Sequence, residues 1–287
     1  MQLECIGGLI EVSVLGVMVA QQPPNLLGVG SSPTGRVSKE SWRNWLAHRT
    51  VTAGVAGSSP VDSVYKELGM LVKKNDVEFQ VTDNLLYESF WNWNDWEIDT
   101  YKNINKFFNQ DKIFIDIGAW IGPIVLYAAK YNKMCYAVEP DPIAYRELQA
   151  NILLNKFNNV YTHNVAISDK IGYTTMGSDT LGNSMTKLGH QHNQFITKTT
   201  TISNFLLENN INKNDIGIIK IDVEGAEVNI LSDEVFNDTE IPVHLSVHTP
   251  FFKHDSDISL ISSFVSKYDN KIETYYPHGF FDVLVYN

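Results

Sequence analysis

The sequence of 287 residues has little cysteine and no excess of positive charge. Its two cysteines, Cys5 and Cys135, are too few for a disulfide framework or a cysteine-rich zinc site. This count suits a reducing compartment, so we expect a cytoplasmic protein. The 22 basic residues face 33 acidic ones, which gives a formal net charge of −11. Because nucleic acid and anionic lipid are held by clustered basic side chains, we expect neither as a partner.

The sequence also lacks a good signal peptide. The first 20 residues are largely apolar, but they include Glu4 and Glu11 and no lysine or arginine. A secretory signal needs a basic start, and a membrane span needs about 20 apolar residues without such interruptions. We therefore expect no stable membrane insertion.

Residues 1–69 differ in composition from residues 70–287. The first segment holds 9 of the 18 glycines and 3 of the 4 arginines, whereas it has only 2 isoleucines and 2 asparagines against 23 and 24 in the rest. The first segment carries 5 basic and 5 acidic residues, and the second carries 17 basic and 28 acidic residues. The whole net charge therefore belongs to the second segment. The sequence thus predicts a domain over residues 70–287.

A near-repeat marks the first segment, because GVGSSPTGRV at 28–37 returns as GVAGSSPVDSV at 54–64. Ser31 and Ser58 are 27 residues apart, close to the codon length of one tRNA gene with a short spacer. We interpret residues 1–69 as an over-extended reading frame that translates tRNA-like sequence, with the genuine start at Met70. The alternative is a disordered leader rich in glycine, serine and proline.

Residues 70–287 alternate strand-like and helix-like segments, which predicts an α/β domain with a mainly parallel sheet and helices on both faces. An antiparallel hairpin around Pro277-His278-Gly279 is expected to close the sheet. The strands are expected at 77–82, 112–118, 133–140, 160–167, 216–222 and 243–249. Helices are expected in the aromatic segment 90–108, after Pro123 and Pro140, and at 201–209, 225–232 and 258–268.

One segment, residues 169–200, breaks this alternation. It is rich in glycine, threonine and histidine, and it alternates as a hairpin does. A segment of this length in a compact domain is usually functional. We expect a β-hairpin or loop excursion here. The tryptophans of 90–108 are expected to pack in the core and on the entry helix. The alternative is that they and the excursion wall an acceptor pocket.

The motif FIDIGAWIGP at 114–123 is a buried strand followed by a glycine turn. A dinucleotide site would require glycine where Trp120 and Pro123 stand, because the backbone must approach the pyrophosphate closely. A phosphate-binding P-loop is excluded because no Gly-Lys-Ser/Thr follows. An NAD(P)-dependent oxidoreductase is therefore disfavoured, although it stays an alternative.

A ligand with a ribose but no diphosphate fits this motif. Glu139 lies 21 residues after Gly118, at the end of the second strand, where it could accept both ribose hydroxyls. Asp116 offers a carboxylate to a cationic amine. S-adenosylmethionine has a ribose, an ammonium and a sulfonium group, so it is the cofactor that the sequence favours.

These segments carry a family resemblance. FIDIGAWIGPIVLYAAK, AVEPDPIAYRELQANILLN, NVAISD and IIKIDVEGAE, in this order over 112–230, resemble the FkbM family of S-adenosylmethionine-dependent methyltransferases. The resemblance implies a class I methyltransferase (Rossmann-like) fold and methylation of a hydroxyl or carboxyl oxygen. Many relatives have asparagine where this chain has Trp120.

The resemblance also implies roles for individual residues. Asp116, Gly118 and Gly122 would shape the methionine pocket, and Glu139 would hold the ribose. Asn164, Val165 and Ala166 would lie by the adenine. Asp222 would lie near the transferring methyl group.

Methyl transfer to oxygen needs a base for the hydroxyl proton, and the candidates are Asp222, Glu224 and His248. Lys220 could pair with Asp222 at strand spacing. Four histidines, at 190, 192, 244 and 248, are candidate ligands of a divalent metal ion. Their spacing does not match a specific metal-binding motif, so no metal site is predicted. We expect a small-molecule, glycan or lipid-linked acceptor. A protein that binds the cofactor as a sensor or scaffold without catalysis is the main alternative.

Overall fold

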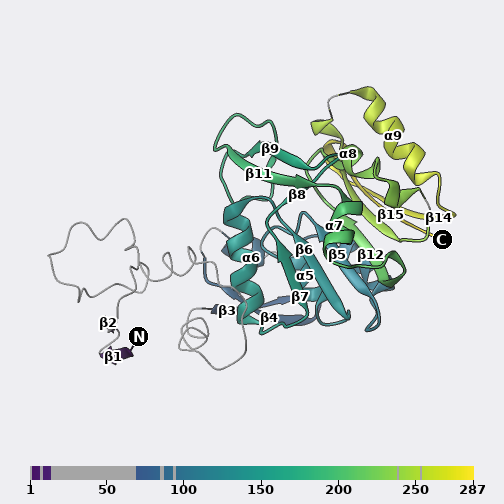
Figure 1. Ribbon diagram of the computed structural model, residues 1–287. Helices are drawn as coiled ribbons and strands as arrows, with labels where there is room; N and C mark the ends of the chain where they lie inside the picture. Colours follow the sequence, from purple (N-terminus) through teal and green to yellow (C-terminus); the bar gives the residue numbers. More distant parts are fainter. Residues whose placement is uncertain are drawn as a thin grey trace. The chain divides into compact units, whose positions relative to one another are not determined.

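The computed structural model describes residues 2–6, 9–13, 69–84, 87–92, 95–237, 239–252 and 254–287 (Figure 1). The chain divides into two compact units, Met1–Glu67 and Leu68–Asn287. In the first, β1 (Gln2–Ile6) and β2 (Leu9–Ser13) pair antiparallel. The rest of the predicted leader lies almost wholly outside the described residues, so its interpretation stays a prediction.

The second unit is built on a seven-stranded sheet. In spatial order its strands are β14 (Asn270–Tyr275), β15 (Phe280–Tyr286), β13 (Val243–His248), β12 (Ile216–Ile221), β5 (Ile113–Ile117), β6 (Met134–Val138) and β7 (Val160–His163). β15 runs antiparallel to both of its neighbours, β13 and β14, and it forms the expected C-terminal hairpin with β14. The other pairs of this sheet are parallel. The expected fold class, an α/β class I methyltransferase fold, is confirmed.

Helices cover both faces of this sheet, and each face has its own cluster of buried apolar residues between the sheet and its helices. One face carries α3 (Glu88–Trp91), α4 (Ile98–Ile104), α5 (Pro123–Ala128) and α6 (Pro142–Leu154). The other carries α7 (Ile202–Glu208), α8 (Glu227–Leu231) and α9 (Asp255–Val265). Because successive side chains of a strand point to opposite faces, Phe114 and Ile115 of β5 belong to different clusters.

Short elements complete the unit. The 3₁₀ helices are η1 (Asn105–Phe107), η2 (Lys213–Asp215), η3 (Glu234–Phe236), η4 (Thr249–Phe251) and η5 (Pro277–Gly279). A hairpin of β3 (Gly69–Lys74) and β4 (Val77–Thr82) lies beside α6. The side chain of Asn151 in α6 accepts a hydrogen bond from the backbone N–H of Thr82 at 2.9 Å, so the helix supplies a partner to a backbone group at the edge of β4.

The strand expected over 160–167 is two strands, and this is a correction. β7 ends at His163, and β8 (Ala166–Ile167) joins a different sheet of order β10-β9-β11-β8. Between them the Asn164 side chain donates to the carbonyl oxygens of Glu139 at 2.8 Å and Pro140 at 3.0 Å, and the chain leaves the sheet here.

The excursion at 169–200 forms most of this second sheet, as expected. It contains β9 (Gly172–Gly177), β10 (Lys187–Leu188) and β11 (Phe195–Thr200). β9 and β11 pair antiparallel, and β11 runs parallel to β8. The second sheet therefore begins, with β8, directly after the carboxyl end of β7.

The strand order of the large sheet reverses between β5 and β12, because the chain proceeds from β5 through β6 to β7 on one side and from β12 to β13 on the other. In open α/β sheets the ligand crevice lies outside the carboxyl ends of the strands at such a point. Among the described residues, no helix has the length and hydropathy to cross a membrane.

Candidate active site

A cavity of about 250 Å³ opens at the carboxyl ends of β5, β6, β12 and β13. Eight of the predicted site residues line it: Asp116, Gly118, Glu139, Val165, Ala166, Asp222, Glu224 and His248. A Cβ atom on Gly118 would lie 1.8 Å from the Asp222 carbonyl oxygen, and its φ is 83°. Glycine is thus required where the ends of β5 and β12 come together.

Glu139 holds the glycine turn in place. Its carboxylate accepts hydrogen bonds from the backbone N–H groups of Trp120 at 2.8 Å and Asp141 at 2.7 Å. Burial raises the pKa of Glu139 to about 8, although these two N–H groups oppose the shift. A carboxylate oxygen accepts more than one hydrogen bond, so the side chain still has capacity for ligand hydroxyl groups.

Trp120 connects the turn to the excursion. Its indole Nε1 donates to the Gly182 carbonyl oxygen at 2.8 Å, and Tyr87 donates to the same oxygen at 3.0 Å. Trp120 also packs edge-on against Phe90, with ring centroids 4.5 Å apart. The indole is therefore part of the cavity wall, and it positions the loop around Gly182.

Asp141 holds the same loop from the start of α6. One carboxylate oxygen caps the helix by accepting from the backbone of Ile143 and Ala144. The other accepts from the Gly182 backbone and from the Thr186 hydroxyl, both at 2.8 Å. Thus the segment that follows β9 is fixed to the body of the domain.

A buried lysine lies between two carboxylates at the floor of the cavity. Lys220 Nζ is 3.5 Å from Asp116 and 3.1 Å from Asp222, and the Lys220 side chain is 3% exposed. Burial alone would lower the pKa of Lys220, but Asp222 and Asp116 raise it above its usual value. Burial raises the pKa of Asp116 to about 6, partly offset by Lys220. The predicted pair of Lys220 with Asp222 is present.

Both oxygens of the fully buried Asp116 carboxylate lack a hydrogen-bond partner. Glu97, which the sequence analysis missed, lines the same cavity and has a buried Oε2 atom that is also unpartnered. Its backbone is left-handed, with φ of 49°, and burial raises its pKa well above the usual range. Nothing in the local sequence marks Glu97, which lies inside the aromatic segment 90–108 directly before α4. These unsatisfied oxygens suit a ligand with cationic groups, so S-adenosylmethionine fits the residues present.

His248 is surrounded by carboxylates. Its Nδ1 is 2.8 Å from Glu227, and its Nε2 is 3.6 Å from Asp222 and 3.7 Å from Glu224. Burial alone would lower the pKa of His248, but the hydrogen bond with Glu227 and the charges of Asp222 and Glu224 raise it to about 9. The surrounding carboxylates thus favour the imidazolium form of His248 at neutral pH, which has no free ring nitrogen to take a proton. The role of His248 as the base stays a prediction.

The other two base candidates differ in charge. Burial opposes ionisation of Asp222, yet Lys220 and His248 lower its pKa below the usual value. Burial raises the pKa of Glu224 to about 7, although His248 acts in the opposite direction. Glu224 therefore titrates closest to neutral pH.

Two predicted cofactor residues, Gly122 and Asn164, are not among those that line the cavity. Gly122 begins α5 with a φ of 95° and packs against Leu148, while Asn164 holds the end of β6 through its hydrogen bonds to Glu139 and Pro140. Both shape the elements behind the cavity.

Two groups of side chains in the described part of the chain could hold a metal ion. Asp222, Glu224 and His248 lie in the cavity, whereas Asp179, His190 and His192 lie in the excursion. His244, considered with His248 in the sequence, is fully buried in β13 and belongs to neither group.

The model of the methyltransferase FkbM domain matches residues 116–272. This match spans more than half of the sequence. The chain belongs to the FkbM methyltransferase family. The resemblance found in the sequence is confirmed, and with it the enzyme class and S-adenosylmethionine as the cofactor of an FkbM protein.

Curated relatives include enzymes that act on tRNA. The chain is 30% identical over 114 residues to the tRNA(Phe) (4-demethylwyosine(37)-C(7)) aminocarboxypropyltransferase of Methanocaldococcus jannaschii, covering 39% of this chain and 41% of that protein. It is 24% identical over 106 residues to the tRNA (guanine(37)-N(1))-methyltransferase Trm5b of Pyrococcus abyssi, covering 37% and 28%. The chain thus spans less than half the length of these relatives.

Solved structures with a similar fold include the methyltransferase FkbM of Methylobacillus flagellatus KT. The TM-score is 0.44 at 15% identity, over 62% of this chain and 44% of that one. M. jannaschii TYW2 in complex with AdoMet gives a TM-score of 0.40 at 16% identity, over 80% and 86%.

Proposed function

We propose that this FkbM protein methylates a hydroxyl or carboxyl oxygen of a small-molecule, glycan or lipid-linked acceptor. The observation that carries the proposal is Glu224, a carboxylate in the cavity with a pKa of about 7. A hydroxyl must lose its proton as the methyl group arrives, and a base is most effective when its pKa lies near the working pH. The cytoplasmic location expected from the cysteine count stays a prediction.

S-adenosylmethionine, when bound, supplies an electrophilic methyl group on a sulfonium. In this proposal Asp116 and Glu97 would face the cationic groups of the ligand, and Glu139 would accept hydrogen bonds from its ribose. Val165 and Ala166, which line the cavity, would lie against the adenine. The assignment follows from charge, because Oε2 of Glu97 is buried without a hydrogen-bond partner and Asp116 shares the buried Lys220 with Asp222.

Glu224 takes the acceptor proton in this scheme, and His248 positions the Glu224 carboxylate. The Glu227 carboxylate fixes the imidazolium of His248 between Asp222 and Glu224. Asp222 stays ionised because Lys220 pairs with it. Of the three predicted base candidates, only Glu224 therefore changes charge near neutral pH.

The acceptor side of the cavity combines aromatic and polar groups. Trp96 and Trp120 line it together with Asn183, Ser184 and Thr186 of the excursion. Aromatic faces pack well on the apolar faces of sugar rings, while amide and hydroxyl groups hydrogen-bond their edges. This composition supports a small hydroxylated acceptor.

The test is a methyl-transfer assay in which the full chain receives S-adenosylmethionine labelled in the methyl group and acceptors of each class in turn. We expect the label in an ether or ester. The rate should rise with pH through about 7, and Glu224→Gln should lower kcat on the order of 100-fold or more and remove this pH dependence. The control is Glu240→Gln, which changes an exposed carboxylate.

A rate that is unchanged in Glu224→Gln would contradict its role as the base. Cofactor binding without methyl transfer to any acceptor class would favour the sensor or scaffold alternative.

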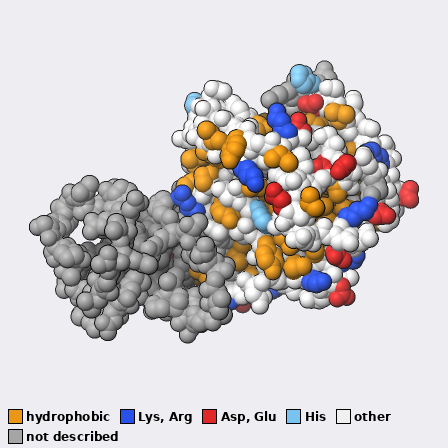
Figure 2. Space-filling view, viewed as in Figure 1, with side chains coloured by type: hydrophobic (Ala, Val, Ile, Leu, Met, Phe, Trp, Pro, Cys, Tyr) orange, Lys and Arg blue, Asp and Glu red, His pale blue; other side chains and the backbone are white. Residues whose placement is uncertain are grey.

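A tRNA acceptor is the second candidate, and the names of the curated relatives favour it. The net charge of −11 opposes it, and on the face drawn in Figure 2 basic and acidic side chains are interspersed instead of forming a basic field. Filter binding with total tRNA at low and physiological salt would decide. Tight, salt-dependent binding together with label in the tRNA would replace the small-molecule proposal.

A further inference from the structure

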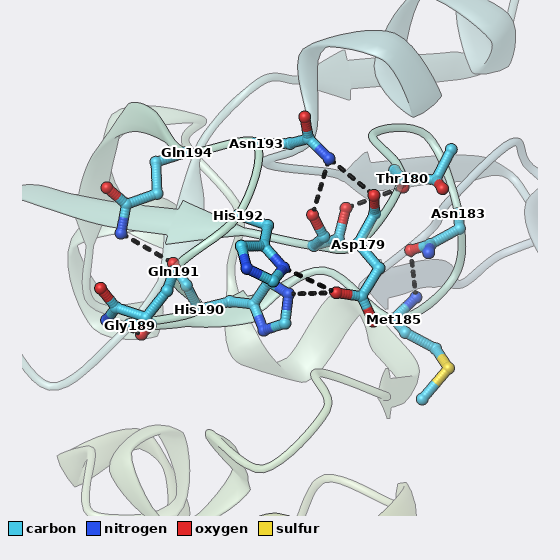
Figure 3. Close-up of polar contacts among 11 residues, drawn as sticks. Asp179, Thr180, Asn183, Met185, Gly189, His190, Gln191, His192, Asn193 and Gln194 are labelled. Carbon is cyan, nitrogen blue, oxygen red and sulfur yellow. Dashed lines mark hydrogen bonds and ion pairs between the residues drawn. The ribbon is translucent and has the colours of Figure 1, made fainter.

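A cluster of two histidines and one aspartate, residue types that ligate metal ions, lies outside the cavity, where the excursion leaves β9 and returns to β11 (Figure 3). Asp179 Oδ1 is 2.9 Å from Nε2 of His190 and 3.2 Å from Nδ1 of His192. The three side chains thus bring the two ends of the loop 178–194 together. We propose that Asp179, His190 and His192 bind a divalent transition metal ion, with zinc as the best match.

The distances suit zinc. In a tetrahedral site with zinc–ligand distances of about 2.0–2.2 Å, neighbouring ligand atoms are about 3.3–3.5 Å apart. The two distances from Asp179 are within a few tenths of an ångström of this spacing, and all three ligand atoms lie within 4.8 Å of one another. Zinc therefore requires only a small movement, with the ion replacing the protons that the imidazoles now share with the carboxylate.

The ligand types and exposure point to the same class of ion. Two imidazoles and one carboxylate favour zinc or a neighbouring transition metal, whereas magnesium and calcium favour oxygen ligands. The side chains of Asp179 and His192 are 78% and 74% exposed, and that of His190 is 20% exposed. Water can thus reach the fourth position, and the ion has an open path to the site.

Contacts next to the three ligands already hold the two ends of the loop together. The side-chain amide of Asn193, a residue with a φ of 41°, donates to the carbonyl oxygens of Ser178 at 3.2 Å and Asp179 at 2.6 Å. A Cβ atom on Gly177 would lie 2.5 Å from the His192 carbonyl oxygen, so glycine permits the close approach of the returning chain. This arrangement reduces the ordering that metal binding would have to impose.

The site is connected to the cavity by the loop itself. The same segment contributes Asn183, Ser184, Thr186 and Leu188 to the cavity wall. The middle of the loop is fixed by the contacts of Gly182 with Trp120 and Asp141. A metal ion held by Asp179, His190 and His192 would in addition fix the two ends of the loop. The inference does not depend on the acceptor or on the identity of the base.

The test is calorimetric titration of the full chain with zinc chloride, after removal of any affinity tag and treatment with EDTA. We expect one equivalent of zinc to bind with micromolar affinity, and magnesium chloride to give no binding. His192→Ala and Asp179→Asn should each weaken zinc binding on the order of 100-fold or more. His278→Asn is the matched control, because it removes an exposed imidazole at a φ of 68°, which asparagine tolerates.

Hydrogen exchange provides a second measurement, in which zinc should slow exchange within residues 178–194 of the wild type and not of His192→Ala. His192 is largely exposed, so its replacement leaves the fold intact. Zinc bound equally well by His192→Ala and the wild type, or no zinc bound by the folded wild type, would overturn the proposal.

Discussion

The strand ends and the excursion each bring histidine and carboxylate side chains together, in very different surroundings. At the strand ends, the side chains of His248, Asp222 and Glu224 are 13%, 19% and 14% exposed. In the excursion, Asp179 and His192 are mostly exposed. Burial alone would lower the pKa of His248, but the neighbouring carboxylates, whose charges act more strongly away from water, raise it to about 9. The exposed cluster is instead open to an ion from solvent. Two clusters of the same residue types thus differ because one is enclosed by charged side chains and the other is open to water.

The strongest way to break the strand-end arrangement is Lys220→Met. It leaves the carboxylates of Asp116 and Asp222 buried without their cation. We expect a loss of about 3–5 kcal/mol in the free energy of unfolding, measured with urea. Lys102→Met, which removes a lysine from an exposed pair with Asp99, should change little. Equal stability of the two variants would show that the buried ion pairs do not hold the strand ends.

His248→Gln tests the charge of the buried histidine. A pKa of about 9 in the folded state, against about 6.5 unfolded, gives a stabilisation that is complete below pH 6.5 and lost as pH rises to 9. We expect this contribution to the free energy of unfolding to be about 3 kcal/mol at most. Urea unfolding at pH 6.5 and 9.5 should show the decline in the wild type and a smaller decline in the variant. Parallel curves would contradict a charged His248.

Trp120→Phe tests the connection between the two regions. The variant keeps an aromatic ring but removes the hydrogen bond to Gly182. We expect a loss of about 1 kcal/mol in the free energy of unfolding and faster hydrogen exchange in residues 178–194. Phe90→Leu is the control, because it disturbs the same aromatic contacts and leaves this hydrogen bond. Unchanged exchange in Trp120→Phe would mean that other contacts fix the loop.

Removal of residues 1–69 should have the smallest effect, since it leaves both regions intact. The chain would then begin at Met70, and β3 would lose only its pair of Gly69 with Thr82. We expect Tm and cofactor affinity to stay within error of the full chain. A large fall in either would contradict the interpretation of the first segment.

Much of the site could be predicted because parallel strands deliver their carboxyl ends to one edge. The strand that carries Asp116 and the strand that precedes Asp222 could both be predicted from their apolar residues. Glu97 could not be predicted, because its place beside the strand ends depends on how the aromatic segment packs. The contact of His248 with Glu227 could not be predicted, because the two residues are 21 positions apart and meet only in the folded chain.

The break between β7 and β8 was missed for a similar reason. The break lies at Asn164, whose side chain donates hydrogen bonds to Glu139 and Pro140. The pattern of apolar residues does not indicate such bonds. The excursion was expected to be functional from its length, and this stays a prediction. The contacts that fix it to Trp120 and Asp141 could be found only in the structure.

Calorimetric titration of the full chain with S-adenosylmethionine tests whether the strand ends hold this cofactor. We predict micromolar binding by the wild type, weakened about 10- to 100-fold in Glu139→Gln, which keeps the volume of the side chain but replaces one of its two acceptor oxygens with an amide donor. A folded wild-type chain that binds no S-adenosylmethionine would show that the strand ends do not hold it.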